Sequence, residues 1–276
     1  MNKHHKRFTV VGAQSIGENT VILTTNCPLE SEPGQYVMVW LPGVSENPLS
    51  IMDGSPLKLA VKKVPSKDKR PFSHEIFRAK EIFVRGPYGR GFSDFIDYDA
   101  EHYLVAGGVG AAPLSFLASR LREGSSKPHI LLGIRDNSEL GWEEYFGACE
   151  TRWLDPCDVM VSTDDGSYGK KGLVTGLFDD IDPPENSQFF ICGPEKMMVA
   201  AAEKASRYTS DENVILSIER YMKCAEGICG GCGITGADNR GYDVCRDGPV
   251  FQYSQLKGGD FGKRHRLKSG LKVQME

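Results

Sequence analysis

Four cysteines near the C-terminal end of the chain give its strongest chemical signal. Their spacing is Cys224-x4-Cys229-x2-Cys232-x12-Cys245. This spacing is typical of a plant-type [2Fe–2S] cluster, in which a tight loop supplies three thiolates and a separate segment supplies the fourth. Glycines surround these cysteines and would let backbone N–H groups approach the sulfur atoms. A structural zinc site with four cysteine ligands is the alternative, although zinc ribbons usually show two C-x2-C pairs and this segment has one.

A glycine-rich turn in the middle of the chain could bind a dinucleotide. The hydrophobic stretch Tyr103–Ala106 leads into Gly107, Gly108 and Gly110, and a helix is expected to open near Pro113. Such a turn exposes N–H groups and the positive end of the helix dipole to a pyrophosphate. Pro113 stands where the last glycine of the G-x-G-x-x-G fingerprint would be, so a tight strand–helix turn without a ligand remains the alternative.

A second strand end supports the dinucleotide interpretation. The stretch Gln188–Cys192 runs into Gly193 and Pro194. Ligands of open α/β sheets bind beyond the carboxyl ends of the strands, and both motifs lie at such ends. Cys192 could approach a nicotinamide there, or it could simply be a small buried hydrophobic residue.

The choice between NAD and NADP stays open at the sequence level. Arg135 follows the expected strand His129–Ile134 and could meet a 2′-phosphate. Asp136 beside it could instead bind a ribose hydroxyl.

The elements that must position these residues change in character near residue 100. Residues 8–95 contain short apolar stretches separated by turn residues, which predicts a small all-β barrel or sandwich. These stretches are Phe8–Val11, Thr20–Thr24, Tyr36–Trp40, Leu57–Val64 and Glu81–Arg85. Strands then alternate with helix-like runs, which predicts a parallel α/β sheet. The expected strands are Tyr103–Ala106, His129–Ile134, Asp158–Ser162, Gln188–Cys192 and Asn213–Ile218, with helices over Leu114–Arg122, Glu139–Phe146 and Glu195–Tyr208.

Composition is that of an ordinary globular protein. Of the 276 residues 40% are hydrophobic and 25% are charged, and the net charge of −4 offers no general attraction to nucleic acid. Eight cysteines would allow four disulfides, but disulfides suit small secreted chains. No apolar run is long enough for a membrane span, and the basic start has no signal-peptide core. We therefore expect a cytoplasmic protein.

We divide the chain into residues 1–100, 101–212, 213–257 and a basic tail at 258–276. The tail could touch RNA or a partner, but a solvated, poorly ordered end is the expectation.

The order of these motifs resembles the ferredoxin–NADP reductase superfamily. Four further segments, Asn47–Ser50, Gly86–Phe92, Thr163–Gly172 and Cys245–Phe251, make the chain similar to the electron-transfer subunits of class 1B dihydroorotate dehydrogenases. The resemblance covers about residues 8–255.

The resemblance implies an antiparallel β-barrel that binds FAD, a parallel α/β domain that binds NAD(H), and a small C-terminal region that binds a [2Fe–2S] cluster. It also implies a catalytic partner that carries FMN and oxidises dihydroorotate in pyrimidine biosynthesis, in a heterotetramer of two plus two subunits. The flavin residues would be Asn47, Pro48, Leu49, Ser50, Val61, Lys62 and Lys63, with Ser73 and His74 in place of the family's Gly-Thr pair. A solvated basic loop over residues 63–74 is the alternative there. The nicotinamide nucleotide would contact Gly107, Gly108, Gly110, Pro113, Cys192, Gly193 and Pro194. Asn47 stands where the family usually has arginine, so FAD rather than FMN rests mainly on the resemblance.

The three centres make chemical sense together. A nicotinamide exchanges a hydride, an iron–sulfur cluster exchanges one electron, and a flavin can do both. Hydride transfer requires no catalytic acid or base from the protein, so we expect none. Two other hypotheses stay open: the small subunit of a sulfide dehydrogenase, hydrogenase or NADPH–ferredoxin oxidoreductase, and a zinc-stapled binding module without redox function.

Overall fold

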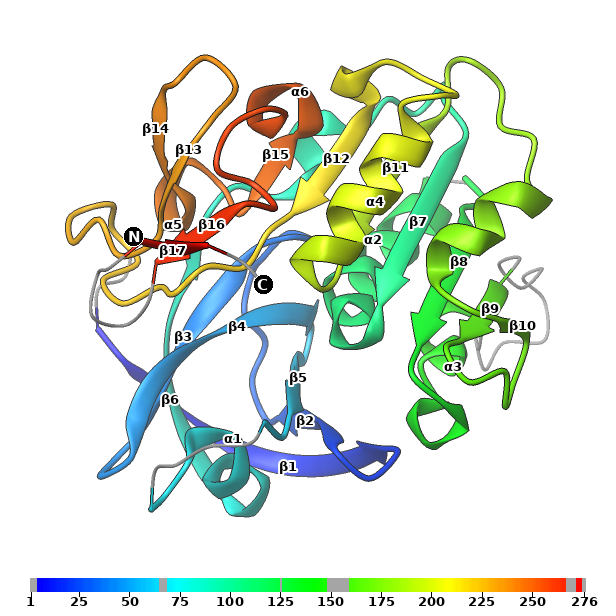
Figure 1. Ribbon diagram of the computed structural model, residues 1–276. Helices are drawn as coiled ribbons and strands as arrows, with labels where there is room; N and C mark the ends of the chain where they lie inside the picture. The colour runs from blue at the N-terminus through cyan, green and yellow to red at the C-terminus, as the bar shows by residue number, and fades with distance from the viewer. Residues whose placement is uncertain (1–3, 65–68, 125, 148–158, 267–271, 275–276) are drawn as a thin grey trace.

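The computed structural model describes residues 4–64, 69–124, 126–147, 159–266 and 272–274. A closed β-barrel is followed by a seven-stranded α/β sheet and by a smaller C-terminal region (Figure 1). The predicted fold class, an antiparallel barrel joined to a parallel α/β unit, is confirmed. Cys149 and Cys157 lie outside the described residues, as do residues 65–68 of the loop that contains Lys67.

The barrel has six antiparallel strands in the order β1-β2-β5-β4-β3-β6. Their bounds are β1 (Lys6–Ile16), β2 (Thr20–Thr25), β3 (Tyr36–Leu41), β4 (Ser45–Gly54), β5 (Leu57–Lys62) and β6 (Glu81–Tyr88). The sequence did not predict β4 as a strand, because Asn47-Pro48 is typical of a turn. Proline is tolerated here because the first half of β4 pairs only with β3, while β5 pairs with β4 from Ile51 onward.

The α/β sheet has the strand order β10-β9-β8-β7-β11-β12-β15. Its strands are β7 (His102–Gly107), β8 (His129–Ile134), β9 (Val159–Thr163), β10 (Lys170–Lys171), β11 (Gln188–Cys192), β12 (Val214–Ser217) and β15 (Val250–Gln252). All neighbours are parallel except β15, which pairs antiparallel with β12. The C-terminal region thus contributes a strand to the sheet. It also contains the ribbon β13 (Gly233–Thr235) with β14 (Gly241–Asp243), and the hairpin β16 (Arg264–Arg266) with β17 (Lys272–Gln274).

The helices are short apart from two that cover the sheet. They are α1 (Phe72–Glu75), α2 (Ala111–Glu123), α3 (Glu143–Gly147), α4 (Glu195–Ala205), α5 (Val244–Asp247) and α6 (Tyr253–Leu256). Alternate residues of a strand face opposite sides of a sheet. Leu104 and Ala106 of β7 pack in the core with α2, whereas Val105 packs in the core with α4, so the two helices cover opposite faces. Among the described residues, no helix is long and apolar enough to cross a membrane.

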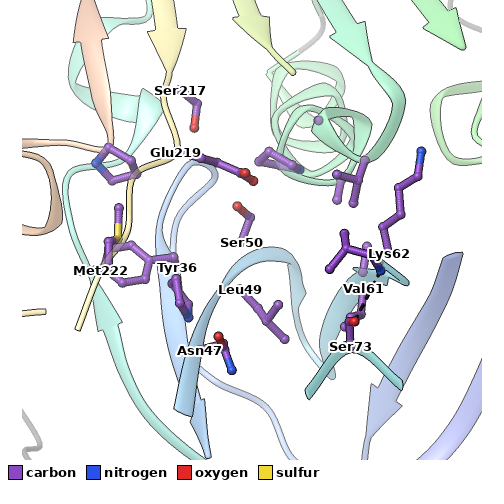
Figure 2. A pocket seen from close by; sticks show the side chains of 18 of the residues that line it. Tyr36, Asn47, Leu49, Ser50, Val61, Lys62, Ser73, Ser217, Glu219 and Met222 are labelled. Atoms are coloured by element: carbon purple, nitrogen blue, oxygen red, sulfur yellow. Dashed lines mark hydrogen bonds between the residues drawn. The ribbon is translucent and has the colours of Figure 1, made fainter. Parts of the chain in front are cut away.

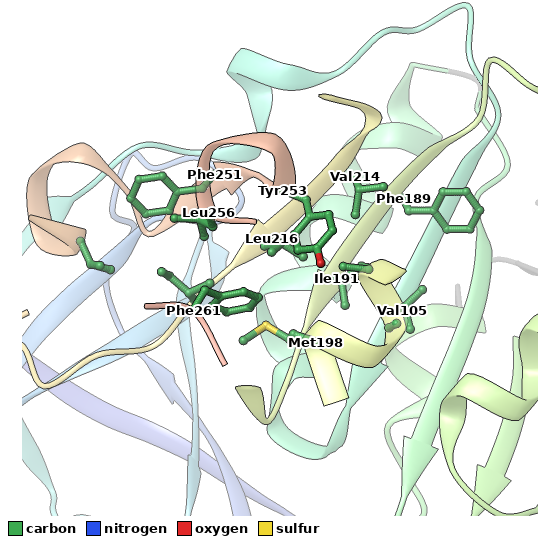
Figure 3. Packing of buried hydrophobic residues seen from close by; sticks show 14 of the residues in the cluster. Val105, Phe189, Ile191, Met198, Val214, Leu216, Phe251, Tyr253, Leu256 and Phe261 are labelled. Atoms are coloured by element: carbon green, nitrogen blue, oxygen red, sulfur yellow. The ribbon is translucent and has the colours of Figure 1, made fainter. Parts of the chain in front are cut away.

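The buried cores join the three parts of the chain. One core combines Tyr36 and Met38 of the barrel with residues of β7, β11 and β12 and with Cys232 and Cys245 of the C-terminal region. Figure 3 shows Phe251, Leu256 and Phe261 of the C-terminal region packed against Leu216 and Met198 in this core. Because the parts share cores, the relative positions of their sites are set by packing.

Two expectations about local structure are wrong. The predicted helix over Glu139–Phe146 reduces to the short helix α3, preceded by a 3-10 turn at Asn137–Glu139. The start of the basic tail is also ordered, because Phe261 is buried and the Gly262 N–H donates to Glu195 Oε1 at 2.6 Å.

Candidate electron-transfer site

Three of the four spaced cysteines lie on the loop between β12 and β13, and the fourth lies on α5. Cys232 and Cys245 are buried, Cys224 is half-buried and Cys229 is exposed. Ile228, beside Cys229, has 78% of its surface exposed. The cysteine group therefore has a buried side toward the protein and an exposed side toward solvent.

Backbone N–H groups point at three of the sulfur atoms. The Glu226 N–H lies 3.4 Å from Cys224 Sγ, the Gly227 N–H lies 3.2 Å from Cys245 Sγ, and the Cys245 N–H lies 3.4 Å from Cys232 Sγ. Gly227 has φ of +70°, a conformation that side chains rarely adopt. N–H groups directed at sulfur stabilise the thiolate form that metal binding requires.

The four thiols form two pairs. Burial opposes ionisation of Cys224, but bonds from backbone N–H groups of the loop and from Cys229 outweigh it and lower the Cys224 pKa to about 6. A hydrogen bond from Cys245 lowers the pKa of Cys232 to about 7 and correspondingly raises the pKa of Cys245. Each pair thus contains one thiol that readily becomes a thiolate.

The pairs fit a two-iron cluster. A [2Fe–2S] cluster with four cysteine ligands needs two of them at each iron. Cys224 with Cys229 and Cys232 with Cys245 are the two pairs available. When bound, such a cluster exchanges single electrons.

The barrel holds the cysteine loop at two points. Arg85 of β6 donates from Nη1 to the carbonyl oxygen of Cys224 at 3.0 Å, and its guanidinium is held by both carboxylate oxygens of Glu46 at 2.7 and 2.9 Å. Tyr36 of β3 donates its hydroxyl to the carbonyl oxygen of Cys245 at 3.0 Å. The first and last cysteines of the group are thereby fixed to the barrel.

A cavity of about 370 Å³ lies between the barrel and the carboxyl ends of the sheet strands (Figure 2). Most of the predicted flavin residues line it, and they come from β4, β5 and α1. They are Asn47, Pro48, Leu49, Ser50, Val61, Lys62 and Ser73. The volume falls within the usual range for small-molecule sites, and the wall combines apolar side chains with a few polar groups. These properties fit the ring system of a flavin.

Lys63 and His74 face a second hollow instead of the cavity. This hollow measures about 270 Å³ and is also lined by Lys69 and Arg78. Pro71 lines both spaces, so the hollow adjoins the cavity. Its cationic groups suit an anion such as a phosphate.

A third hollow of about 340 Å³ follows the glycine turn. Its walls include the predicted nucleotide residues Gly107, Gly108, Gly110, Cys192, Gly193 and Pro194, while Pro113 lines the flavin cavity on the other side of the turn. A Cβ atom at Gly110 would lie 2.3 Å from the carbonyl oxygen of Cys192. The two predicted motifs therefore touch, and glycine is required for that approach.

Five residues line both the flavin cavity and the nucleotide hollow, and they are Lys62, Val109, Gly110, Cys192 and Glu219. Burial raises the pKa of the Cys192 thiol, so it stays neutral. The Glu219 side chain is exposed at the cavity, yet the surrounding protein desolvates its carboxyl group and raises the pKa. A molecule in the flavin cavity would thus meet one in the hollow directly.

An ion pair joins the two units next to the glycine turn. Lys62 Nζ of the barrel lies 2.6 Å from Glu139 Oε1 of the α/β unit. Both side chains lie 3.9 Å from the position of a Cβ atom at Gly108. Lys62 therefore places a cation, paired with Glu139, beside the turn.

Comparison with known proteins identifies the family. A model described as the iron–sulfur cluster binding domain of dihydroorotate dehydrogenase B matches residues 219–257, and an oxidoreductase NAD-binding domain matches residues 104–203. Two relatives carry the name "Probable dihydroorotate dehydrogenase B (NAD(+)), electron transfer subunit". The Pyrococcus horikoshii protein is 37% identical over 269 residues, and the Pyrococcus furiosus protein is 38% identical over 272 residues. In each case the match covers 96% of this chain and 97% of the relative.

The chain belongs to the family of dihydroorotate dehydrogenase B electron transfer subunits. It is an oxidoreductase subunit, as predicted, and the family matches support an iron–sulfur cluster rather than zinc. A solved structure from a study of an NADH-dependent reduced ferredoxin–NADP oxidoreductase is also similar, with a TM-score of 0.74 at 26% identity. That match covers 92% of this chain and 90% of the other.

Sequence reasoning missed several residues of the cavity wall. Tyr36, Ser217, Glu219 and Met222 all line it and are drawn in Figure 2. Ser217 ends β12, so the rule that ligands bind at carboxyl ends of strands could have found it and Glu219. Tyr36 and Met222 offered no such signal, because each reads as an ordinary buried residue.

Arg135 and Asp136 lie beyond both spaces at the end of β8. Asp136 accepts hydrogen bonds from the backbone N–H and the hydroxyl of Ser138, while Arg135 is exposed. Neither residue lines the nucleotide hollow, so the contacts expected of them with a 2′-phosphate or a ribose hydroxyl stay predictions.

Proposed function

We propose that this chain carries electrons between a catalytic dihydroorotate dehydrogenase partner and NAD, through FAD and a [2Fe–2S] cluster. One observation carries the proposal: the flavin cavity adjoins both other sites. It shares five wall residues with the nucleotide hollow, and its wall residue Tyr36 is hydrogen-bonded to Cys245 of the cysteine group. The three sites therefore lie in series. A bound flavin exchanges hydride with a nicotinamide and single electrons with a cluster.

The protein's own groups position and insulate these centres. Gly107, Gly108 and Gly110 leave room for a nucleotide against the strand ends, and Lys62 supplies a cation beside the turn. The neutral Cys192 thiol packs between the two spaces and adds no charge. Two electrons and one proton convert NAD⁺ to NADH, and the electrons come from dihydroorotate oxidised in the partner.

We further propose FAD rather than FMN. The cationic hollow of Lys63, Lys69 and Arg78, whose wall also includes His74 and Glu75, adjoins the cavity through Pro71 and would take the second phosphate and adenosine of FAD. Asn47 does not supply the charge that arginine would, because its amide is neutral; the amide donates to Ser45 Oγ at 2.8 Å. The cationic hollow compensates for that difference.

The partner is proposed to be an FMN-containing subunit in a heterotetramer of two plus two, which the family resemblance supports. The exposed Cys229 edge is the natural side for its approach. The bounds 1–100, 101–212 and 213–257 are proposed as flavin, nicotinamide and cluster units. A cytoplasmic location is proposed because free cysteines for a cluster require a reducing compartment.

A second candidate function is a small subunit of an NADPH–ferredoxin oxidoreductase. The similarity in fold to the solved oxidoreductase favours it. It differs in the electron donor and acceptor, not in the three centres of this chain.

Anaerobic absorbance spectra of the chain purified with its partner test these proposals. NADH and dihydroorotate should each bleach both the flavin and the cluster bands. Cys229→Ser should remove iron and prevent dihydroorotate from bleaching the flavin, while NADH should still reduce the flavin. Cys27→Ser is the matched control, because Cys27 lies outside the cysteine group. Zinc in place of iron would refute the redox function, and bleaching by reduced ferredoxin but not dihydroorotate would favour the second candidate.

A further inference from the structure

Tyr36 occupies a position that neither the motifs nor the family match explain. It is the first residue of β3, and its side chain is 3% exposed. On one side it lines the proposed flavin cavity, where it pairs across the strands with Ser50. On the other side its hydroxyl reaches the cysteine group. A single side chain thus spans the protein between two proposed redox centres.

The contact at the cysteine end is specific. The hydroxyl donates to the backbone carbonyl of Cys245 at 3.0 Å in a buried setting. Cys245 itself lies in the buried pair with Cys232, and both belong to the core that contains Tyr36. From the phenol oxygen, the hydrogen bond and the covalent bonds of Cys245 lead to its sulfur atom without a gap.

The surroundings hold the ring in place. The Tyr36 ring packs against the Tyr88 ring with centroids 5.9 Å apart. A Cβ atom at Gly89 would lie 3.1 Å from Tyr36 Cε1 and 2.6 Å from Pro249 Cδ, so glycine lets the barrel close onto the segment after Cys245. Such close packing leaves the ring few alternative rotamers.

We propose that Tyr36 is the positioning residue that couples the flavin to the cluster, with its ring on the flavin cavity and its hydroxyl on Cys245. Electronic coupling falls off less steeply along covalent and hydrogen bonds than across a gap, so this route favours the iron held by Cys232 and Cys245. Tyr36 is neither oxidised nor reduced in this role. This inference rests on the proposed function.

The test is Tyr36→Phe in the holoprotein, which removes the hydroxyl and keeps the ring. In anaerobic stopped-flow mixing with NADH, the flavin should be reduced at the wild-type rate, while cluster reduction, followed by its visible bands and by freeze-quench EPR, should slow several-fold. Iron content, flavin content and the midpoint potential of the cluster should stay at wild-type values. Tyr253→Phe is the matched control, since Tyr253 belongs to the same buried core but lines neither the cavity nor the nucleotide hollow.

The outcomes separate the inference from the function on which it rests. If the wild-type protein contained no flavin or cluster, or NADH reduced neither, the proposed function would fail. If wild type behaved as expected and Tyr36→Phe reduced its cluster equally fast, only the coupling role would fail. Loss of cofactor from the variant, or a shifted cluster potential that accounts for the slower rate, would also overturn it in favour of a purely structural or tuning role.

Discussion

Gly110 offers the most direct test of how the two nucleotide motifs meet. An added Cβ atom at Gly110 would lie 2.3 Å from the carbonyl oxygen of Cys192, 2.5 Å from its carbonyl carbon and 2.7 Å from the nitrogen of Gly193. All three atoms belong to the backbone, so no side chain can rotate away. The backbone angles of Gly110, φ −61° and ψ −14°, suit alanine, so the effect of a Gly110→Ala change is purely steric.

The size of the effect follows from this geometry. Overpacking in a filled interior costs about 1–3 kcal/mol, and a backbone obstacle places Gly110→Ala toward the upper part of that range. Each kcal/mol lowers Tm by about 2–4 °C in a chain near this size. Pushing β11 away from the turn should also weaken NADH binding, because the strand end and the turn form opposite walls of the same hollow.

The assay compares thermal unfolding and NADH titration for the holoprotein and two variants. Gly176→Ala is the control, because a Cβ atom there has no neighbour within 4 Å; it should be neutral or slightly stabilising. If Gly110→Ala matched the wild-type Tm and NADH affinity, the contact between the two motifs would be wrong.

Three further predictions concern charge and surface. Burial alone would raise the Glu46 pKa, but hydrogen bonds from Arg85 and His5 hold it below the ordinary value. The carboxylate therefore stabilises the fold above the unfolded carboxyl pKa of about 4.3, and this contribution is lost as pH falls. Glu46→Gln should lower Tm at neutral pH and match wild type in acid, and a Tm difference that stays constant with pH would contradict the ion pair. Desolvation raises the Glu219 pKa, although the side chain is exposed at the cavity, so the ionised share of the carboxyl group grows as pH rises. The carboxylate attracts the cationic ring of NAD⁺, so Glu219→Gln should weaken NAD⁺ binding relative to NADH by about 1 kcal/mol, or about fivefold, and by less as pH falls. Equal losses for both nucleotides in calorimetric titration would refute this. The Ile228 side chain is 78% exposed beside Cys229, so Ile228→Asp should leave Tm unchanged but reduce co-purification of the partner. Val11→Asp, at a side chain 63% exposed on the barrel, is the control and should not reduce co-purification. If Ile228→Asp still retained the partner, the interface would lie elsewhere.

The sequence predicted the parts of the site that depend on local spacing. Three of the cysteines lie within nine residues, and the glycine turn directly follows its strand, so each motif can be recognised from the sequence without knowledge of the fold. Met222 is different, because only the pairing of β12 with β11 brings the segment after β12 to the cavity beside the barrel. Lys63 and His74 were assigned to the flavin with the rest, but Lys63, which directly follows β5, and His74 of α1 line the cationic hollow instead.

β4 shows a second limit. A proline inside a strand normally argues against that strand. Pro48 is accommodated because the chain on its other side has moved away, which also opens the wall where the cavity lies. The feature that hid the strand from sequence reasoning is therefore the feature that makes room for a ligand.

The uneven exposure of the cysteine group has a consequence for how electrons are contained. Cys232 and Cys245 are sealed in the core, but Cys229 opens to solvent. An outlet of this kind cannot distinguish a docked protein from dissolved dioxygen, which accepts electrons at any accessible reduced centre. The catalytic subunit would then act as an insulator as well as a donor. Separated from that subunit, the chain should consume NADH in air and release superoxide or peroxide. Assembly with the subunit should suppress this loss of electrons to oxygen.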